Sequence, residues 1–464
     1  MALVESFSGI RGVYDDGLDE QVALRYTYSY LSLLKKKNKR KIKIVIGTDT
    51  RHSKDIIKNA VLDALDCEVI DLGIASTPMA EYGVRNYKAQ GGIIITASHN
   101  EPYWNGFKFL DSNGCVLNVK DMDKVIKKYN KIKNLSNEEF SQLFFKNKKL
   151  ERNITKKNKE INKKYSDYAL SFISKKDISK IKKSKLKVVL DPNGGTGVIS
   201  KEILEKLGVK VKGVNMDYGI FNRAVEPTED SLFYLSNLVR DGNYDFAAGF
   251  DCDADRVEIM AAKGLVSGNY LLALIADDIL ENKKNKKIVV NDATSLVVKE
   301  IAKKHKAKYY EVQVGEVNVV DKMHKVKAQV GGEGSSGGII VPDSRCRDGV
   351  LTLIYILKVL ANKGKKIEEV IRELPQFYNI KKKITINKKN NKQIQNKIIK
   401  YYSKKGLKIK YTENGSIKVF LSSKSYAWFR ASKTEANVLR VIADSNDKKR
   451  AESIMEEAFG LISK

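Results

Sequence analysis

Cysteine, proline and long apolar runs are all scarce in this sequence of 464 residues. The four cysteines lack the close pairing of a zinc site or of a disulfide framework, so we expect reduced thiols. No apolar run approaches the roughly 18 residues of a membrane span, and the N-terminus lacks the basic-then-apolar layout of a signal peptide. The sequence therefore predicts a cytoplasmic protein with no membrane partner.

Acidic residues are also in deficit, because 85 lysines and arginines face 56 aspartates and glutamates and give a net charge of +29. Such an excess can indicate nucleic-acid binding, since basic side chains that neutralise phosphates release counterions. Here the charge is spread along the chain, with lysine interleaved with asparagine at 35–41, 145–164 and 381–392. No stacking aromatic motif of the RNA-binding type is evident. We interpret the lysines as solvated surface and expect no specific nucleic-acid partner, although their field would attract anionic substrates.

The chain is too long for one hydrophobic core, and its length predicts roughly three or four domains. Three segments repeat one pattern, in which basic residues lead into an apolar strand, a polar turn and then a helix. They are KIKIVIGTDTR from residue 41, SKLKVVLDPNGGTG from residue 184 and NKKIVVNDATS from residue 285. The pattern predicts three related α/β layers. Helices are also expected at 19–36 and from Pro78 to about residue 88.

The segment GGIIITASHNEPYWNGFK at 91–108 joins a buried strand to a polar turn and a lysine. Ile93–Ile95 form the strand, because β-branched residues favour buried strands. Ligands bind at the carboxyl ends of strands in α/β proteins, so Ser98 is placed like a nucleophile, with His99 beside it. An isolated Ser-His pair is more often an ordinary turn, and only the rest of the chain favours the functional interpretation.

A carboxylate cluster follows an apolar strand in the segment FAAGFDCDADRVE. In an extended segment Asp251, Asp253 and Asp255 would point to one side, since side chains alternate along a strand. Crowded carboxylates need a counter-charge, and a hard cation with oxygen ligands such as Mg²⁺ would supply it. An EF-hand is excluded, because Arg256 stands where glycine is needed and Ala262 where a bidentate glutamate is needed. A solvated acidic loop is the alternative interpretation.

Two further loops carry residue types that suit a sugar phosphate. VGGEGSSGGII at 330–340 presents Glu333, Ser335 and Ser336 on glycine-rich backbone, which suits sugar hydroxyls, although such loops also serve as mere turns. RASKTE at 430–435 carries a guanidinium, hydroxyls and a lysine just before an expected helix. Bidentate charge and helix-start amides are what phosphate binding requires.

These motifs, in this order, resemble those of the α-D-phosphohexomutase family, whose members include phosphomannomutase/phosphoglucomutase and phosphoglucosamine mutase. TASHN with NGFK is similar to the family's phosphoserine loop, DCDADR to its metal loop, GEGSSG to its sugar-recognition loop and RASKTE to its phosphate-binding loop. SGIRG near the N-terminus is similar to the family's opening motif. The resemblance spans the chain from Ser8 to about Asp444.

The resemblance implies an α/β protein of heart shape with four domains around one cleft. Three would be related α/β domains with mixed sheets, and the C-terminal one an α+β domain of different fold. We expect them at 1–150 with the phosphoserine loop, 151–256 with the metal loop, 257–370 with the sugar-recognition loop and 371–464 with the phosphate-binding loop.

The resemblance also implies an isomerase that interconverts hexose 1-phosphate and hexose 6-phosphate, with mannose and glucose phosphates as leading substrates. Ser98 would carry a phosphoryl group and exchange it with the sugar phosphate through a hexose 1,6-bisphosphate. Ser98, Asp251, Asp253 and Asp255 would hold Mg²⁺. The other candidate catalytic residues are Arg11, Lys108 and His99. The candidate substrate-binding residues are Arg256, Gly315, Glu333, Ser335, Ser336, Arg430, Ser432, Lys433 and Thr434. Sugar phosphates are the expected partners, and the protein is expected to be a monomer or homodimer.

The sequence departs from the family's pattern at several positions. Gly337 or Gly338 stands where many bacterial members have histidine, so the family's general base is either absent or supplied elsewhere. The other departures are Glu101 for a proline, Cys252 and Ala254 for glycines, and Ala431 and Ala436 for prolines.

Three alternatives remain open from the sequence. The nearest is a phosphoglucosamine mutase, which the serine-bearing sugar loop disfavours only weakly. A haloacid-dehalogenase-type phosphatase would use Asp251 as nucleophile, since DCDAD begins like that family's motif, but Asp255 stands where threonine or valine is needed. A non-enzymatic nucleic-acid-binding protein that uses the lysine excess is the most remote.

Overall fold

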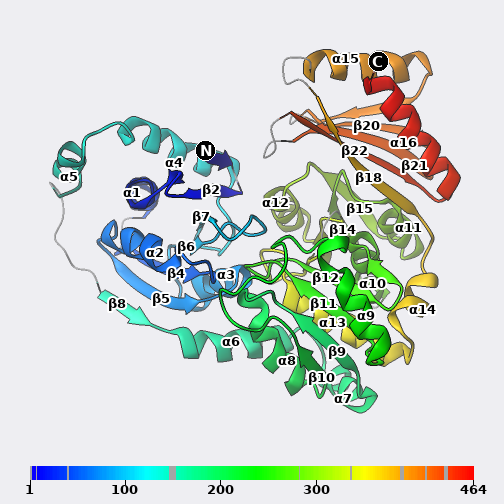
Figure 1. Ribbon diagram of the computed structural model, residues 1–464, viewed down its shortest axis with the longest axis horizontal. Coiled ribbons are helices and arrows are strands. Elements are labelled where there is room, and N and C mark those ends of the chain that lie inside the picture. The colour runs from blue at the N-terminus through cyan, green and yellow to red at the C-terminus, as the bar shows by residue number, and fades with distance from the viewer. Residues whose placement is uncertain are drawn as a thin grey trace. The chain divides into compact units, whose positions relative to one another are not determined.

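The computed structural model describes residues 3–6, 8–38, 41–145, 153–281, 283–334, 337–386, 391–412, 415–432 and 437–463 (Figure 1). The chain divides into two compact units. Unit 1 holds Met1–Val266 with Gly337–Ile367, and unit 2 holds Ser267–Ser336 with Glu368–Lys464.

The first sheet of unit 1 is built from the strands β1 (Val4–Ser6), β2 (Gly9–Tyr14), β3 (Gly17–Leu18), β4 (Lys43–Thr48), β5 (Glu68–Ile74), β6 (Gly91–Ile95), β7 (Trp104–Leu110) and β8 (Asn153–Lys156). Its order is β1-β2-β7-β6-β4-β5-β8, with β3 paired to β2. The accompanying helices are α1 (Glu20–Lys37), α2 (Lys54–Asp63), α3 (Thr77–Asn86), α4 (Val119–Ile132), α5 (Asn137–Phe145) and α6 (Asn158–Leu170).

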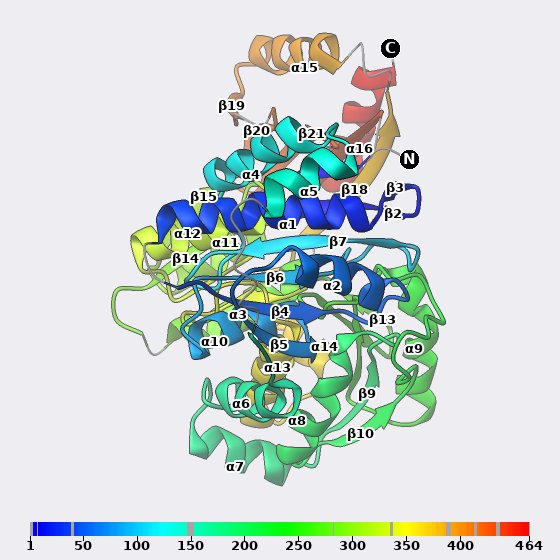
Figure 2. The same ribbon diagram turned by 90° about the vertical axis from the view of Figure 1, so that its left-hand side faces the viewer.

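This sheet is covered on both faces, as expected for parallel strands with apolar residues throughout. Ile44 and Ile46 of β4 pack in one core with residues of α1, α2 and α4. Val45 faces the other way, where it lies near Gly83 of α3 together with Ile161 of α6. Figure 2 shows α1 along the strands of this sheet.

The helices and strands expected in this region are confirmed. The helix expected at 19–36 is α1, which begins after Asp19 because the Asp19 carboxylate accepts a hydrogen bond from Val22 N. The helix expected from Pro78 is α3, with proline in its first turn. The strand expected at 93–95 is the fully buried β6.

The second sheet of unit 1 contains β9 (Lys187–Asp191), β10 (Lys210–Gly213), β11 (Phe246–Phe250), β12 (Val257–Ala261) and β13 (Gly264–Val266). Its order is β10-β9-β11-β12-β13. Unit 1 also contains α7 (Lys175–Ser184), the 3₁₀ helix η1 (Thr196–Ile199), α8 (Ser200–Lys206), α9 (Glu229–Asp241), β17 (Ile339–Ile340) and α13 (Gly349–Lys363).

Unit 2 combines a parallel sheet with an antiparallel one. The first part contains α10 (Gly268–Glu281), β14 (Lys287–Asn291), α11 (Leu296–Lys304), β15 (Lys308–Val312), α12 (Glu316–Val326) and β16 (Val330–Gly332). After α14 (Ile367–Arg372), the C-terminal part contains β18 (Tyr378–Thr385), α15 (Asn391–Lys404), β19 (Lys408–Tyr411), β20 (Ile417–Ser422), β21 (Ser425–Ala431), β22 (Val438–Ser445) and α16 (Lys448–Ser463). The order of this antiparallel sheet is β18-β22-β21-β20-β19.

The faint sequence repeat corresponds to a shared topology. Its three strands are β4, β9 and β14, and each lies between two parallel neighbours, in the orders β5-β4-β6, β10-β9-β11 and β15-β14-β16. In each case the central strand comes first in the chain and the next strand lies on one side of it. The expectation of three related α/β layers and a C-terminal α+β domain is confirmed.

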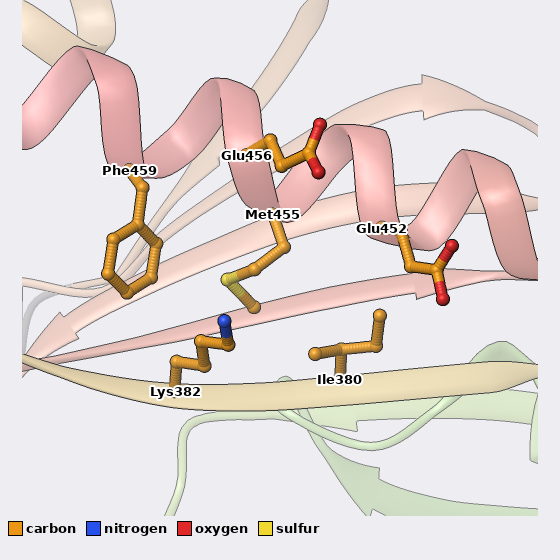
Figure 3. A pocket seen from close by; sticks show the side chains of 6 residues that line it. All are labelled: Ile380, Lys382, Glu452, Met455, Glu456 and Phe459. Atoms are coloured by element: carbon orange, nitrogen blue, oxygen red, sulfur yellow. The ribbon is translucent and has the colours of Figure 1, made fainter.

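The C-terminal sheet leaves a hollow of about 500 Å³ against α16. Figure 3 shows Met455 and Phe459 projecting from α16 toward Ile380 and Lys382 of β18. The Lys382 ammonium lies 5.3 Å from the centre of the Phe459 ring, so the lysine covers apolar surface here. None of the motifs singled out in the sequence contributes to this hollow.

Within the described part of the chain, every helix is too short or too polar to cross a membrane.

Replacing Gly106 by alanine should lower the melting temperature. Gly106 of β7 pairs with Arg11 of β2, and an added Cβ would lie 2.0 Å from the Ile10 carbonyl oxygen. Because that neighbour is backbone, the two strands must separate, at a cost of about 1–3 kcal/mol. Gly460→Ala is the control, since no atom lies within 4 Å of its added Cβ and alanine favours a helix by about 0.5–1 kcal/mol. Equal melting temperatures for Gly106→Ala and the wild type would contradict this close strand pairing.

Candidate active site

The serine loop connects β6 to β7 in unit 1. Ser98 is buried and adopts a left-handed backbone conformation with φ of 53°. A residue other than glycine keeps this conformation only where its surroundings hold it. The Ser98 backbone N–H donates to Thr96 Oγ1 at 2.8 Å, and the Thr96 hydroxyl donates to Asp49 at 2.6 Å. The loop is therefore fixed from its first residues to the carboxyl end of β4.

Arg51 is the principal support of the serine loop, and the sequence reasoning missed it. Its side chain is fully buried and pairs with Asp49 at 3.0 Å. Its two terminal nitrogens donate to the backbone carbonyl oxygens of Ser98 at 2.8 Å, Asn100 at 2.6 Å, Trp104 at 2.9 Å and Glu101. One planar guanidinium thus binds most of the turn. The aspartate and arginine in the motif TDTR, directly after a buried strand, were the available signal.

The carboxylate cluster lies in a tight turn between β11 and β12. The expectation of an extended segment is wrong, because Ala254 takes a left-handed conformation with φ of 54° and its N–H donates to the Asp251 carbonyl at 3.3 Å. Reversal of the chain, rather than strand alternation, brings the carboxylates together. Oxygens of Asp251, Asp253 and Asp255 lie within 4.8 Å of one another, and all three residues are buried.

Residues from three other segments of unit 1 contact this cluster. The Ser98 hydroxyl lies 3.2 Å from Asp251 Oδ2. The Lys108 ammonium donates to Asp253 at 2.6 Å and to Asp255 at 2.9 Å. Two further contacts come from residues that the sequence reasoning missed: the Thr77 hydroxyl donates to Asp253 at 2.6 Å, and Arg347 lies 3.4 Å from Asp255. Arg256 stands slightly farther away, 3.8 Å from Asp255 and 4.0 Å from Asp251.

The surroundings shift the pKa values of Asp251 and Asp255 in opposite directions. Burial raises the pKa of Asp251 well above its ordinary value, and the neighbouring charges of Asp253 and Asp255 raise it further. Burial acts in the same direction on Asp255, but Arg347, Lys108 and Arg256 together hold its pKa far below the ordinary value. Asp253 Oδ1 is buried without a hydrogen-bond partner. An unpartnered carboxylate oxygen in a dry acidic cluster fits a hard cation.

His99 belongs to the serine loop and Arg11 contacts this loop through Asn100, but the two side chains differ in charge. Burial, together with Arg256 and Arg11, lowers the pKa of His99 well below its ordinary value, so the imidazole is neutral at pH 7. His99 Nδ1 is buried without a hydrogen-bond partner. Burial lowers the pKa of Arg11 to about 10, which leaves it charged at pH 7, and its guanidinium donates to Asn100 Oδ1 at 2.9 Å.

The sugar loop and the phosphate loop lie in unit 2. Glu333 Oε1 accepts hydrogen bonds from the backbone N–H of Gly315 at 2.9 Å and from the side chain of Asn291 at 2.8 Å. Gly315 begins α12 with φ of 129°, a conformation open to glycine. Arg430 is the last residue but one of β21 and is half-buried. Burial lowers its pKa, while the carboxylates of Asp292 and Glu333 act in the opposite direction. Unit 2 thus brings Glu333, Gly315 and Arg430 to one region.

Some predicted residues lie outside the described part of the chain: Ser335, Ser336, Lys433 and Thr434. The helix expected after RASKTE is wrong, because the next element described is the strand β22, which pairs with β21 along its whole length. Pairing with a long neighbouring strand outweighed the local signal for a helix start.

Neither Gly337 nor Gly338 could carry a histidine. An added Cβ on Gly337 would lie 1.7 Å from the Val257 carbonyl oxygen, and one on Gly338 would lie 2.6 Å from the Asp255 carbonyl oxygen. Gly338 also has φ of 117°. The backbone of this segment lies too close to the backbone of residues 255–257 for a side chain at either position.

Comparison with known families agrees with the resemblance seen in the sequence motifs. Family models of phosphoglucomutase/phosphomannomutase match in three places: α/β/α domain I at residues 5–136, domain II at 163–264 and domain III at 267–378.

Individual proteins match over nearly the whole chain. A phosphoglucomutase/phosphomannomutase of Thermococcus kodakarensis is 32% identical over 462 residues, which cover 98% of this chain and 97% of that protein. A phosphoglucosamine mutase of Methanococcus maripaludis is 30% identical over 467 residues, covering 98% of each. The crystal structure of a phosphoglucomutase/phosphomannomutase family protein from Burkholderia thailandensis has a TM-score of 0.82 at 18% identity and covers 99% of this chain and 96% of that one, which indicates the same fold.

Arg51→Lys should loosen the serine loop. Lysine has one ammonium and cannot reach four carbonyl oxygens and Asp49 at once. We expect amide hydrogen exchange at residues 98–105 to accelerate about tenfold or more, with exchange in β9 and β11 unchanged. Arg240→Lys is the matched control, since the Arg240 side chain is 59% exposed and pairs with Asp241 on the surface. Unaltered exchange of the serine loop in Arg51→Lys would refute the supporting role of this arginine.

Proposed function

Because the chain belongs to the α-D-phosphohexomutase family, we propose that it interconverts the 1-phosphates and 6-phosphates of mannose and glucose through a phosphoserine enzyme. Enzymes of this family are isomerases that act by phosphoryl transfer, and they depend on Mg²⁺. The observation that carries the proposal is the contact between the buried hydroxyl of Ser98 and the carboxylate cluster, at 3.2 Å from Asp251. A serine held there in a strained conformation is suited to accept and release a phosphoryl group.

The cation would be held by Asp251, Asp253 and Asp255 together with the oxygen of Ser98. The unpartnered Oδ1 of Asp253 supports this assignment. When bound, Mg²⁺ would offset the negative charge on the transferring group. Lys108 and Arg347 offset part of the negative charge of the cluster from the protein side, since each pairs with Asp255.

In the first transfer, the bond between phosphorus and Ser98 Oγ breaks while a bond forms to the free hydroxyl oxygen of the sugar phosphate. The product is a hexose 1,6-bisphosphate, and the reverse transfer from its other end restores the phosphoserine. Arg11 and Lys108 would stabilise charge on the transferring oxygens. The substrate must bind in two orientations, because the phosphate that is not transferred changes between the two steps.

His99 would accept the proton that the sugar hydroxyl loses. Arg11 stays charged at pH 7, whereas the neutral imidazole of His99 has an unpartnered nitrogen. The glycines at 337 and 338 leave no place for a histidine in the sugar loop. The serine loop would therefore supply both the nucleophile and the base.

The substrate would be recognised by unit 2. Glu333 would accept hydrogen bonds from sugar hydroxyls, with Gly315 hydrogen-bonded to it and the serines at 335 and 336 nearby in sequence. Arg430, Ser432, Lys433 and Thr434 would bind the phosphate that is not transferred, and Arg256 of unit 1 would clamp a phosphate oxygen.

Mannose and glucose phosphates are favoured by the name of the Thermococcus relative at 32% identity. Glucosamine phosphate is the second candidate, because a relative at 30% identity carries the name phosphoglucosamine mutase.

Purified enzyme with Mg²⁺ and glucose 1,6-bisphosphate should convert glucose 1-phosphate and mannose 1-phosphate at least about tenfold more efficiently than glucosamine 6-phosphate, a difference within the range that one polar contact provides. Coupled assays of each product give kcat/KM for the three substrates. Chelation with EDTA should abolish all three activities, and Mg²⁺ should restore them. Preference for the amino sugar would overturn the substrate assignment while leaving the family reaction intact.

Labelling should place the phosphoryl group on Ser98. After incubation with glucose 1,6-bisphosphate, peptide mapping should find a stable phosphate on Ser98 in the wild type and none in Ser98→Ala. His99→Gln should become fully but slowly labelled, and its transfer to glucose 1-phosphate in a single turnover should be about 10²–10⁴-fold slower, since that is the usual contribution of a general base. An acid-labile acyl phosphate on Asp251 would instead support a phosphatase, and rapid transfer by His99→Gln would rule out His99 as the base.

A further inference from the structure

A short turn in unit 2 is held by the sugar loop on one side. The NDAT turn, residues 291–294, follows β14 directly. Asn291 donates to Glu333 at 2.8 Å, and the backbone N–H of Gly334 donates to the Thr294 hydroxyl at 3.2 Å. The Asp292 carboxylate accepts from Val314 N at 3.1 Å, next to Gly315. Both segments expected to contact the sugar are therefore fastened to this turn.

The C-terminal sheet holds the same turn from the other side. The Ser416 hydroxyl donates to the second oxygen of the Asp292 carboxylate at 2.8 Å, and the Lys418 ammonium donates to the Asp292 carbonyl at 2.8 Å. The Tyr426 hydroxyl lies 3.1 Å and 3.0 Å from the carbonyl oxygens of Ala293 and Thr294. Every residue of the NDAT turn except Asn291 is thus bound by the C-terminal domain.

Lys418 makes further buried contacts besides its hydrogen bond to Asp292. Its side chain is 1% exposed, and it pairs with Glu311 at 2.7 Å. Its ammonium also lies 4.1 Å from the centre of the Tyr426 ring. A buried ammonium with a carboxylate, a carbonyl and an aromatic face has little freedom to move, and removing it would leave buried acceptors without a donor.

The same strands carry the phosphate loop. Lys418 of β20 pairs in register with Trp428 of β21, two residues before Arg430. Tyr426 lies on β21 as well. The position of Arg430 relative to the NDAT turn is therefore determined by Lys418 and Tyr426, while the position of Glu333 relative to that turn is determined by Asn291.

We infer that Lys418 is a positioning residue that sets the spacing between Glu333 and Arg430, so that unit 2 selects sugar phosphates whose hydroxyls and distal phosphate reach both at once. The inference rests on the proposed function. A ligand that touches both sites gains from their correct spacing, because its second contact is intramolecular, whereas a ligand that touches one site gains nothing. Free phosphate meets only the Arg430 side, and a hexose phosphate meets both.

Lys418→Met tests whether the spacing of Glu333 and Arg430 matters for a hexose phosphate but not for free phosphate. We expect the KM for glucose 1-phosphate to rise about tenfold or more, with a smaller change in kcat, and the inhibition constant of inorganic phosphate to stay within about twofold of the wild type. Lys410→Met is the matched control, because Lys410 pairs with the other oxygen of Glu311 at 2.9 Å, is 42% exposed and does not touch the NDAT turn. It should leave both constants unchanged.

If Lys418→Met does not fold, Tyr426→Phe tests the same inference, since it removes only the hydroxyl that binds the NDAT turn. It should raise the KM for glucose 1-phosphate about threefold or more, again without a change for inorganic phosphate. A KM within twofold of the wild type, or a parallel rise of the phosphate inhibition constant, would overturn the inference. Wild-type enzyme that converts no hexose phosphate would instead overturn the proposed function, and the inference would fall with it.

Discussion

Three buried carboxylates within 4.8 Å of one another constrain everything around them, because like charges in a dry interior repel strongly unless cations balance them. The balancing groups of unit 1 come from distant parts of the chain. Lys108 lies within β7, the strand that follows the serine loop, and Arg347 lies just before Asp348, the N-cap of α13. Since each side chain contacts Asp255, the strand β7 and the segment before α13 must both lie close to the turn between β11 and β12. The electrostatic requirement of the cluster thus helps to determine how the two sheets of unit 1 are joined.

The three α/β layers share one feature at the carboxyl ends of their central strands. Each central strand ends at a buried aspartate, and these are Asp49 after β4, Asp191 at the end of β9 and Asp292 after β14. Each carboxylate accepts hydrogen bonds that fix a neighbouring loop: from Thr96 and Arg51, from Arg223 and Tyr234, and from Val314 and Ser416 respectively. A carboxylate at the end of a parallel strand can bind several donors without using the sheet's own hydrogen bonds. All three layers therefore use a buried aspartate to bind neighbouring segments, while the residues of those segments differ from layer to layer.

Much of the fold and part of the site followed from the sequence, because their signals are local. Local residue types predicted β6 and α1, and the spacing of three aspartates within five residues predicted their convergence, although a left-handed Ala254 produces it rather than strand alternation. Arg51 and Arg347 were missed because their partners lie 47 and 92 residues away, and nothing near them in the sequence identifies those partners. The helix expected after RASKTE failed for the same reason: pairing of β22 with β21 depends on the whole antiparallel sheet.

The large positive charge and the buried lysines are separate features of the chain. Among the residues that the structure describes, only Lys108 and Lys418 are buried lysines. Burying an ammonium costs several kcal/mol unless carboxylates and carbonyls compensate it, and both lysines meet that condition, Lys108 with Asp253 and Asp255 and Lys418 with Glu311 and Asp292. Lys108 contacts the carboxylate cluster of unit 1, and Lys418 contacts the NDAT turn of unit 2. The other lysines in the described part of the chain are partly or fully exposed, so the lysine excess lies outside the core.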